Sequence, residues 1–310
     1  MAPLVLAVLL AAGGYWGARH FRAHPAPAAA APKPTRVPTA EPIPRRTGAG
    51  RPTAVPLLTT PAPPRHGRPS VTARSAILVN ASTGAVLWQK RPHRRRPIAS
   101  TTKIMTAAIV LERLRLARVV KIAPAVPRIP LVREGLRARE RVPVWKLLDG
   151  LLIFSGNDDA LALAVATAGS RRGFVALMNG KARQLGLHDT HFSSVSGVID
   201  AGNYSSAWDL AALARYAMRE PTFRRIVSTR IARVPWTAPT YRKVYVNKNA
   251  LLGAYRGADG VKTGWTTIAG HCVVASAHRN GVRLIAVLLH ARDPYHDARL
   301  LLNLGFVLSR

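Results

Sequence analysis

Strand-forming runs lie at both ends of the chain beyond residue 72, and helical patterns fill the part between them. Residues 75–79 and 85–88 are rich in β-forming residues and flank a Ser-Thr-Gly turn. Residues 272–275 and 284–288 flank an Asn-Gly step, which is a strong signal for a two-residue hairpin. Because a hairpin must bury one face against other elements, the two ends are expected to share one sheet. The pattern predicts an α/β (α+β) fold with an antiparallel sheet and an inserted helical lobe.

The inserted part is expected to be largely helical. Apolar periodicity begins near Ser100 and continues to about residue 114, and the stretch 157–168 is alanine-rich and helix-like. Three more helices are predicted, over 145–152, over 210–218 with Ser206 and Asp209 at its N-terminal cap, and over 297–308. Residues 191–204 are predicted to form a loop.

The first 71 residues differ in composition from the rest of the chain. Residues 1–18 lack charged side chains and include an apolar run, so residues 1–23 are predicted to be a signal peptide or an N-terminal membrane anchor. The basic residues follow this run instead of preceding it, which is unusual for export, and a misassigned start codon is one explanation. Residues 24–71 are rich in Pro and Ala and are predicted to be a disordered linker. The catalytic-sized domain is expected over 72–310.

The chain is strongly basic, with 46 Lys and Arg residues against 14 Asp and Glu, a formal charge of +32. Such a charge favours polyanions, either nucleic acid or anionic wall polymers. Aromatic residues make up only 6% and are not interleaved with basic runs, so sequence-specific nucleic-acid binding is not expected. The single cysteine, Cys272, excludes an intrachain disulfide and a thiolate zinc site, and it is expected in the core. No metal or other cofactor is predicted.

Three short motifs follow one another in a fixed order. Residues 100–103 read Ser-Thr-Thr-Lys, residues 155–157 read Ser-Gly-Asn, and residues 262–264 read Lys-Thr-Gly. Together they offer a nucleophilic hydroxyl, an amine to deprotonate it, a polar relay and a cationic strand edge for an anionic acyl substrate. Each motif alone is weak, but the order and spacing indicate a serine acyl-transfer enzyme without a histidine triad.

From about residue 75 to residue 306 the chain resembles the penicillin-binding D-alanyl-D-alanine carboxypeptidases. The resemblance rests on residues 98–107, 151–158 and 259–264, and on the tail at 301–306. It implies a β-lactamase/transpeptidase-like fold with helices on both sides of the sheet. It also implies peptidoglycan stem peptides as substrates, β-lactam antibiotics as covalent inhibitors, and a location in the cell envelope, membrane-anchored or secreted.

The resemblance assigns catalytic roles to four residues. Ser100 would attack the carbonyl of the penultimate D-alanine and form an acyl-enzyme, and Lys103 would be the general base. Burial and the nearby cation Lys262 would both lower the pKa of that amine. Ser155 would relay protons, and Asn157 would bind the substrate backbone and Lys103.

Residues 260–263 are predicted to form a strand, and four residues on it or directly after it would bind the substrate. Lys262 and Thr263 would hold the terminal carboxylate, and Gly264 would let the substrate backbone approach the strand edge. The backbone amides of Ser100 and Trp265 would form the oxyanion hole.

Simpler interpretations exist for each motif. A serine at the start of a helix is by default an N-cap, which is one interpretation of Ser100. The Ser-Gly-Asn stretch could end one helix and begin the next, and this is compatible with a catalytic role. Two departures from the family pattern affect substrate specificity: the loop containing Arg292, and the stretch 194–197, which reads Ser-Val-Ser-Gly.

Other functions remain open. A β-lactamase shares the motifs, but residues 158–200 contain no glutamate for the rapid deacylation of the common class. A DD-endopeptidase would use the same machinery. A non-catalytic basic protein that binds wall polyanions is the alternative from a different class. Because the chain stops after the matching tail, any contact with a membrane is expected at the N-terminus.

Overall fold

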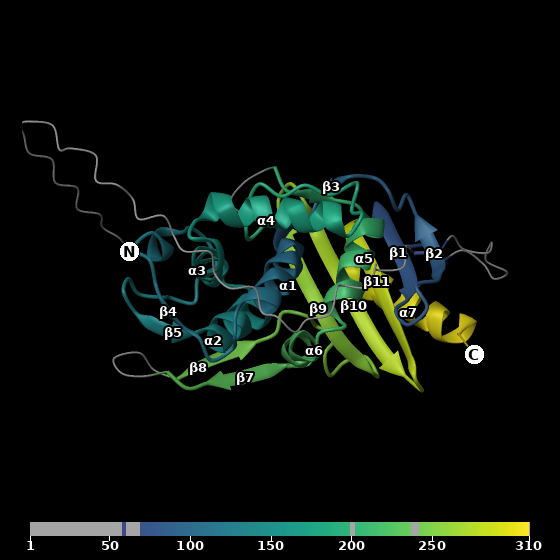
Figure 1. Ribbon diagram of the computed structural model, residues 1–310. Helices are drawn as coiled ribbons and strands as arrows, with labels where there is room; N and C mark the ends of the chain where they lie inside the picture. The colour runs from purple at the N-terminus through teal and green to yellow at the C-terminus, as the bar shows by residue number, and fades with distance from the viewer. Residues whose placement is uncertain (1–57, 60–68, 199–201, 237–241, 310) are drawn as a thin grey trace, which may run out of the picture. The chain divides into compact units, whose positions relative to one another are not determined.

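The computed structural model describes residues 58–59, 69–198, 202–236 and 242–309 (Figure 1). The predicted signal or anchor segment and nearly all of the predicted linker lie outside these residues. Five positions of the predicted linker are described, residues 58–59 and 69–71. Leu58 is buried in the core, and Thr59 forms a parallel bridge with Ala85.

A five-stranded antiparallel sheet forms the centre of the domain. Its order is β2-β1-β11-β10-β9, so strands from both ends of the chain lie side by side, as the sequence predicts. In β1 and β11, for example, Ile77 pairs with Val287. The strands are β1 (Ser75–Asn80), β2 (Val86–Lys90), β9 (Ala258–Thr266), β10 (Gly270–Arg279) and β11 (Val282–Ala291).

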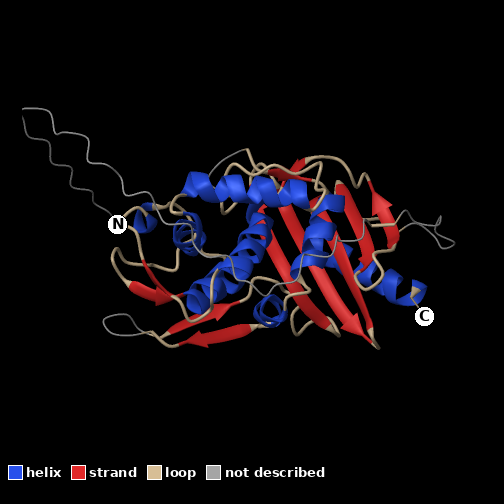
Figure 2. Cartoon of the chain, viewed as in Figure 1, coloured by secondary structure: helices blue, strands red, loops and turns tan. Residues whose placement is uncertain are grey.

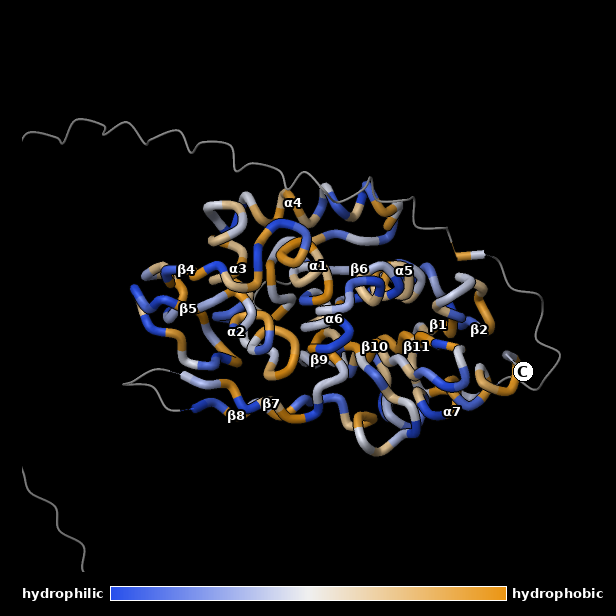
Figure 3. Tube along the Cα trace, turned by 60° about the horizontal axis from the view of Figure 1, so that its bottom comes forward, coloured by the Kyte–Doolittle hydropathy of each residue, from blue (hydrophilic) through white to orange (hydrophobic). Residues whose placement is uncertain are grey.

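Alternating side chains of the sheet enter two different cores, because neighbouring residues of a strand point to opposite faces. In β1, Ile77 and Val79 pack with the helical lobe, whereas Ala76 and Leu78 pack with α7 (Pro294–Leu308). On the lobe side the sheet is covered by α5 (Ala207–Ala217), so helices lie on both sides (Figures 1 and 2). Figure 3 shows hydrophobic residues along β10 and β11, between these layers.

The helical lobe is inserted between β2 and β9. Its principal elements are the 3-10 turn η1 (Ala99–Thr102), α1 (Lys103–Arg113), α2 (Val144–Asp149), the π-helical turn η3 (Gly150–Phe154), α3 (Asn157–Ala168), α4 (Arg171–Gln184) and α6 (Pro221–Ser228). The first eight residues of α1 are all buried. This helix therefore forms the centre of the lobe and is held rigidly.

Three two-stranded sheets complete the described part. They are β3 (Arg96–Pro97) with β6 (Tyr204–Ser205), β4 (Val119–Lys121) with β5 (Arg141–Pro143), and β7 (Ile231–Val234) with β8 (Lys243–Val246); the 3-10 turn η2 (Val126–Arg128) lies between β4 and β5. Among the described residues, no single helix is both long and apolar enough to cross a bilayer, although α3 and α4 pass that test as a pair bent by 84°.

Local structure refines several predicted boundaries. The helix predicted from Ser100 begins as the 3-10 turn η1 and becomes α-helical only at Lys103. The predicted helix 145–152 changes to a π-helical turn after Asp149. The cap at Ser206 is confirmed, since its hydroxyl accepts the amide of Asp209. The Asn-Gly hairpin is confirmed as well, with a positive φ at Asn280 and at Gly281.

Candidate active site

The hydroxyl of Ser100 faces the amine of Lys103 at the junction of η1 and α1. The Lys103 Nζ to Ser100 Oγ distance is 2.9 Å, and both side chains are buried. The N-cap positions of η1 and α1 are Ile98 and Thr102, and neither helix start has a side-chain cap. Ser100 is therefore not a helix cap, and its hydroxyl is directed at the amine.

The Lys103 amine has three partners. Besides the Ser100 hydroxyl it contacts Oδ1 of Asn157 at 2.8 Å and the carbonyl oxygen of Ser196 at 3.2 Å. Burial lowers the pKa of Lys103 well below its usual value, and the charge of Lys262 lowers it further. No carboxylate forms an ion pair with this amine among the residues that the structure describes. A neutral amine is the form that these surroundings favour.

The Ser-Gly-Asn motif forms the turn between η3 and α3. Ser155 adopts a left-handed conformation with φ of 74°, and the amide of Gly156 donates to the carbonyl of Gly150. Asn157 begins α3 and is fully buried. Ser155 is buried too, but within the described part of the chain its hydroxyl has no hydrogen bond to Ser100 or Lys103.

The Lys-Thr-Gly motif lies on β9, an edge strand that runs beside the nucleophile. A Cβ on Gly264 would lie 2.7 Å from the backbone nitrogen of Ser100, so the strand passes in close contact with η1. The amine of Lys262 is buried and donates to the carbonyl of Thr263. Burial lowers the pKa of Lys262 to about 7, and the charge of Lys248 contributes. The indole of Trp265 is 59% exposed at the end of the same strand.

The loop that contains residues 194–197 belongs to the site, which the sequence did not predict. Besides the Ser196 carbonyl, this loop provides the Val195 carbonyl, which accepts the hydroxyl of Thr106. Gly197 has φ of +76°, and a Cβ there would lie 2.0 Å from the carbonyl oxygen of Ala99. Glycine is therefore required at this contact with the nucleophile turn. In the sequence, Gly197 next to a Ser-rich stretch was the one signal that could have indicated this part of the site.

Asn203 fixes this loop against the helix that carries the nucleophile. Its Oδ1 accepts the amides of Ser193 and Ser194, and its Nδ2 donates to the hydroxyl of Thr102. All three groups are near Lys103 in the chain or in space. The loop and the nucleophile turn are therefore held in one arrangement.

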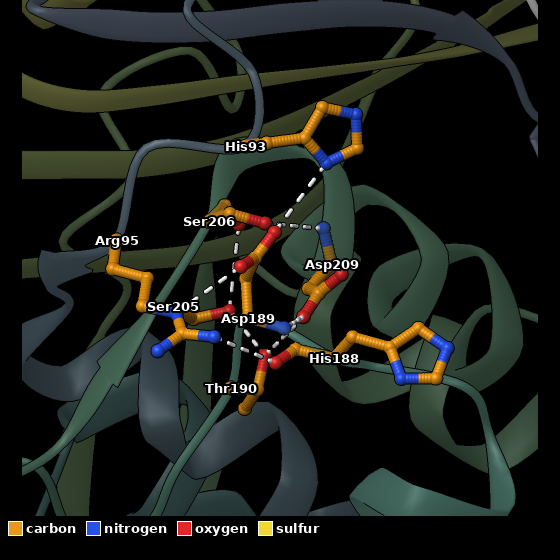
Figure 4. A network of polar contacts seen from close by, with 8 residues as sticks. All are labelled: His93, Arg95, His188, Asp189, Thr190, Ser205, Ser206 and Asp209. Carbon is orange, nitrogen blue, oxygen red and sulfur yellow. Dashed lines mark hydrogen bonds and ion pairs between the residues drawn. The ribbon is translucent and has the colours of Figure 1, made fainter.

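A second polar network holds the base of the same loop (Figure 4). Asp209, near the start of α5, accepts the amide of Asp189 and the hydroxyl of Thr190. The carboxylate of Asp189 in turn accepts Nε of Arg95, at 3.1 Å. Arg95 directly precedes β3, which leads into the nucleophile turn. This network therefore connects the segment before the nucleophile turn to the base of the 194–197 loop.

Buried acidic residues lie beneath the Ser-Gly-Asn turn. Asp158 accepts four backbone amides, those of residues 134–136 at 2.9 to 3.1 Å and that of Asp159 at 3.2 Å. The carboxyl of Asp159 fills the space between two glycines, since a Cβ would approach its Oδ2 to 2.0 Å from Gly156 and to 2.5 Å from Gly150. Burial raises the pKa of Asp159 well above its usual value, and the charge of Glu134 adds to this. These surroundings favour the protonated form of Asp159.

Glu134 connects this cluster to β8. Its carboxylate accepts the hydroxyl of Tyr245, and it lies 3.5 Å from the amine of Lys243. Burial is the main cause that raises the pKa of Glu134, whereas the Lys243 charge lowers it. Titratable side chains therefore link β8 to the loop 129–140 and to the turn of the Ser-Gly-Asn motif.

Arg292, the approximate replacement for a family arginine, lies at the end of β11. Its backbone amide donates to the hydroxyl of Thr72, and its side chain is exposed. Cys272 is fully buried, as the sequence predicts.

The sequence matches the Peptidase S11 family, described as D-alanyl-D-alanine carboxypeptidase, over residues 60–293. The D-alanyl-D-alanine carboxypeptidase of Streptomyces sp. (strain K15) is 36% identical over 266 residues, which is 78% of this chain and 89% of that protein. The carboxypeptidase DacF of Bacillus subtilis is 34% identical over 245 residues. That match covers 77% of this chain and spans 62% of the length of DacF.

Solved structures agree with these matches. The crystal structure of the Streptomyces K15 DD-transpeptidase matches with a TM-score of 0.73 at 35% identity, over 78% of this chain and 100% of that one. A penicillin-binding protein homologue from Mycobacterium tuberculosis gives a TM-score of 0.75 at 32% identity, over 81% and 97% of the two chains. The fold is thus that of the penicillin-binding DD-peptidases. Within that class, the chain belongs to the D-alanyl-D-alanine carboxypeptidase family of serine hydrolases.

Proposed function

We propose that this protein is a serine D-alanyl-D-alanine carboxypeptidase that removes the terminal D-alanine from peptidoglycan stem peptides. The observation that carries the proposal is the contact between the buried Lys103 amine and the Ser100 hydroxyl, 2.9 Å apart. A hydroxyl needs an adjacent base to become a nucleophile at neutral pH, and a desolvated amine supplies one. Family membership supports the substrate class.

Acylation would begin with proton transfer from Ser100 to Lys103. A neutral amine has two N–H bonds and one lone pair. Its N–H bonds would donate to Asn157 and to the Ser196 carbonyl, which leaves the lone pair for the Ser100 proton. The freed oxygen attacks the carbonyl of the penultimate D-alanine, and the amides of Ser100 and Trp265 would stabilise the oxyanion.

Collapse of the tetrahedral intermediate breaks the peptide bond. The proton held on Lys103 passes to the leaving amine of the terminal D-alanine, and Ser155 is the proposed relay. Ser155 lies in the turn directly before Asn157, whose side chain contacts the base. Water then attacks the acyl-enzyme while the same base accepts its proton. The bond between the acyl carbon and the Ser100 oxygen breaks, and Lys103 returns the proton to that oxygen, which regenerates Ser100.

Recognition of the terminal carboxylate is assigned to the β9 edge. Lys262 and Thr263 would bind the carboxylate, and Gly264 allows the substrate backbone to approach. A bound carboxylate next to the buried Lys262 would favour its charged form, so binding would raise the pKa of this amine above its value of about 7.

A transpeptidase is the second candidate, because the relative from Streptomyces K15 is named both a D-alanyl-D-alanine carboxypeptidase and a DD-transpeptidase. The acyl-enzyme would then be attacked by a peptide amine instead of water. A DD-endopeptidase would cleave cross-links with the same residues. Release of D-alanine from a D-Ala-D-Ala peptide, with and without an added acceptor amine, distinguishes hydrolysis from transfer.

Labelling with a fluorescent penicillin tests the chemistry itself. A stable adduct on the wild type that is absent from Ser100→Ala supports the assignment. Rapid turnover of the reagent would identify a β-lactamase, and absence of an adduct from both proteins would indicate a non-catalytic binding protein.

The place of action is a further part of the proposal. We infer an exported protein of the cell envelope, with residues 1–23 as the signal or membrane contact, because peptidoglycan is extracytoplasmic. The formal charge of +32 favours association with anionic wall polymers. Mass measurement of the mature N-terminus after expression in a bacterial host distinguishes a cleaved signal from a retained anchor.

A further inference from the structure

The hairpin of β7 and β8 has an outer face that no described element covers. Ile231 is paired with Val246, and Arg233 is paired with Val244. Residues opposite each other in an antiparallel pair, and residues two apart along a strand, point to the same face of a sheet. The three apolar side chains of this face are between 46% and 58% exposed. They therefore form one apolar cluster on the surface, beside a guanidinium group.

The inner face of the same hairpin is packed on the helical lobe. Tyr245 is buried in the core of the lobe and donates to Glu134. Glu140 accepts the indole N–H of Trp236, whose ring lies under the amine of Lys243, and Lys243 points to the same side as Tyr245. A two-stranded sheet is stable when one face packs on other elements, and Thr favours a strand as Val does. The fold therefore does not require apolar residues on the outer face.

The chain around the hairpin is strongly basic. Residues 221–258 contain eight Lys and Arg residues but no Asp or Glu. Arg233 lies within the outer face, and Arg242, directly before β8, is in line with Val244 and Val246. Both arginines are exposed, and neither forms an ion pair within the described part of the chain. The outer face therefore combines aliphatic side chains with positive charge.

This combination selects among the possible partners of the face. A second copy of the chain would place Arg233 and Arg242 close to their own counterparts, with no carboxylate between them. A wall polyanion would bind the charges but leave the Ile and Val side chains in water. A bilayer that contains anionic lipids presents negative headgroups directly above an apolar layer. It is the partner that matches both properties of the face.

We propose that the outer face of the β7–β8 hairpin binds the surface of an anionic phospholipid bilayer. Its Ile and Val side chains enter the boundary between headgroups and acyl chains, and Arg233 and Arg242 extend to the phosphates. Because the inner face contacts Glu134, close to the Ser-Gly-Asn turn, docking holds this side of the active site near the membrane. The proposal depends neither on the carboxypeptidase mechanism nor on residues 1–23.

A fluorophore on the outer face tests the proposal in the full-length protein. Val244→Cys is labelled with an environment-sensitive dye. The native Cys272 is fully buried, and burial raises the pKa of its thiol to about 11, so the new thiol is the one that reacts. The matched control is Val307→Cys on α7. Val307 is 55% exposed, and α7 lies at the far end of the domain from the hairpin (Figures 1 and 3).

We expect phosphatidylglycerol vesicles to shift the emission of the probe at position 244 to shorter wavelength. Phosphatidylcholine vesicles should leave it unchanged, and more phosphatidylglycerol should be needed as the salt concentration rises. The probe at position 307 should not respond to either lipid, because α7 faces away from the docked surface. This control also separates docking of the hairpin from membrane insertion of another segment.

Two variants that carry the label at position 244 separate the face from the dye. Arg233→Gln should weaken the affinity for phosphatidylglycerol vesicles about fivefold, because it removes one positive charge at the lipid surface. Ile231→Thr/Val246→Thr keeps branched side chains but reduces their apolar surface, and it should weaken the affinity at least about fivefold. Penicillin acylation should be unchanged in both, which verifies that they are folded.

Several results would overturn the proposal. The probe at position 244 could fail to respond to phosphatidylglycerol, the probe at position 307 could respond equally, or both variants could bind as tightly as their labelled parent. An equal response of the probe at position 244 to soluble oligo(glycerol phosphate) would assign the face to a wall polymer. A shift that depends on protein concentration without vesicles would assign it to a second copy of the chain.

Discussion

Nζ of Lys103 and Oδ1 of Asn157 lie 2.8 Å apart, although 54 positions of the chain separate the two residues. The contact joins the first residue of α1 to the first residue of α3. It fixes the orientation of the amine, because Asn157 can accept one N–H while the Ser196 carbonyl accepts another. The geometry leaves the remaining position of the amine for Ser100.

Replacing the amine should slow acylation strongly without unfolding the protein. Lys103→Met keeps an unbranched side chain only one atom shorter and removes the base. Loss of a general base should slow penicillin acylation by roughly 10²- to 10⁴-fold. The measurement is the acylation rate under single-turnover conditions.

The control is Lys181→Met, which makes the same change at an ion pair with Glu112 on the helices. It should acylate at the wild-type rate. Wild-type acylation by Lys103→Met would show that another group deprotonates Ser100.

The charge of Lys262 should set the alkaline limit of peptide hydrolysis. Lys262 must be protonated to bind the terminal carboxylate, and its pKa in the free protein is lowered to about 7. kcat/KM reports groups of the free enzyme, so it should fall by about tenfold for each pH unit above 7. Arginine remains protonated in this range, so Lys262→Arg should lose that decline. The measurement is D-alanine release across pH, and an identical decline in both proteins would contradict the assignment.

Contact between β9 and the nucleophile turn should make Gly264 intolerant of a side chain. A Cβ would lie 2.7 Å from the nitrogen of Ser100, so Gly264→Ala must move the strand or the proposed oxyanion hole. Loss of one oxyanion donor lowers kcat by about 10²- to 10³-fold, and we expect a decrease in this range for acylation. Gly180→Ala, in α4 with open space around it, should leave acylation unchanged and slightly raise Tm. Equal acylation by both variants would contradict the prediction.

Much of the architecture could be predicted from the sequence, because β-forming runs and the residues of tight turns indicate where strands begin and end. The Asn-Gly step at 280–281 identified the β10–β11 hairpin, and the apolar run over 297–308 predicted the closing helix. The short strands β4, β5, β7 and β8 were not predicted, because three or four residues are too few to show alternation. Tertiary contacts determine such strands.

The site was predicted in part. Motif order pointed to Ser100 and Lys103, but the Ser196 carbonyl could not be found this way, since a backbone carbonyl leaves no signature in its side chain. Asp159 was missed for a different reason. In sequence it is simply an acidic residue in the first turn of a helix, where acids are common, and only its burial between two glycines sets it apart.

Asp149 should limit stability at neutral pH. It ends α2, is buried, and makes no side-chain hydrogen bond among the described residues. Burial raises its pKa to about 6, whereas an unfolded aspartate has its usual value of 3.8. The folded state binds more protons between these values, so stability decreases as pH rises through that window and the loss is complete above it.

The neutral variant Asp149→Asn should therefore be more stable at pH 7, by up to roughly 3 kcal/mol, and about equal to the wild type below pH 4. Asp158→Asn is the contrast, because that carboxylate accepts four backbone amides, and its loss should destabilise by about 1–3 kcal/mol. Urea unfolding at both pH values measures the two effects. A destabilised Asp149→Asn at pH 7 would contradict the prediction.

Asp159 should affect the acidic limit of acylation through its charge, which raises the pKa of Lys103 when present. Burial and the charge of Glu134 raise the pKa of Asp159 and so disfavour that charge. Glu134→Gln removes one of these causes. Asp159 then ionises at lower pH, the Lys103 amine stays protonated to higher pH, and the acidic limb of acylation should move upward by about one pH unit.

The double variant Asp159→Asn/Glu134→Gln separates this effect from damage to the fold. Asn fills the same space between Gly150 and Gly156 but cannot ionise, so the acidic limb should return to its wild-type position. Asp158, Lys243 and Tyr245 also face the pair and are unchanged in both variants, so they add the same field to each. The acylation rate is measured from acidic to neutral pH. If the acidic limb stays shifted in the double variant, the charge of Asp159 is not the cause. The shift would then come from the loss of the contact between Glu134 and Lys243.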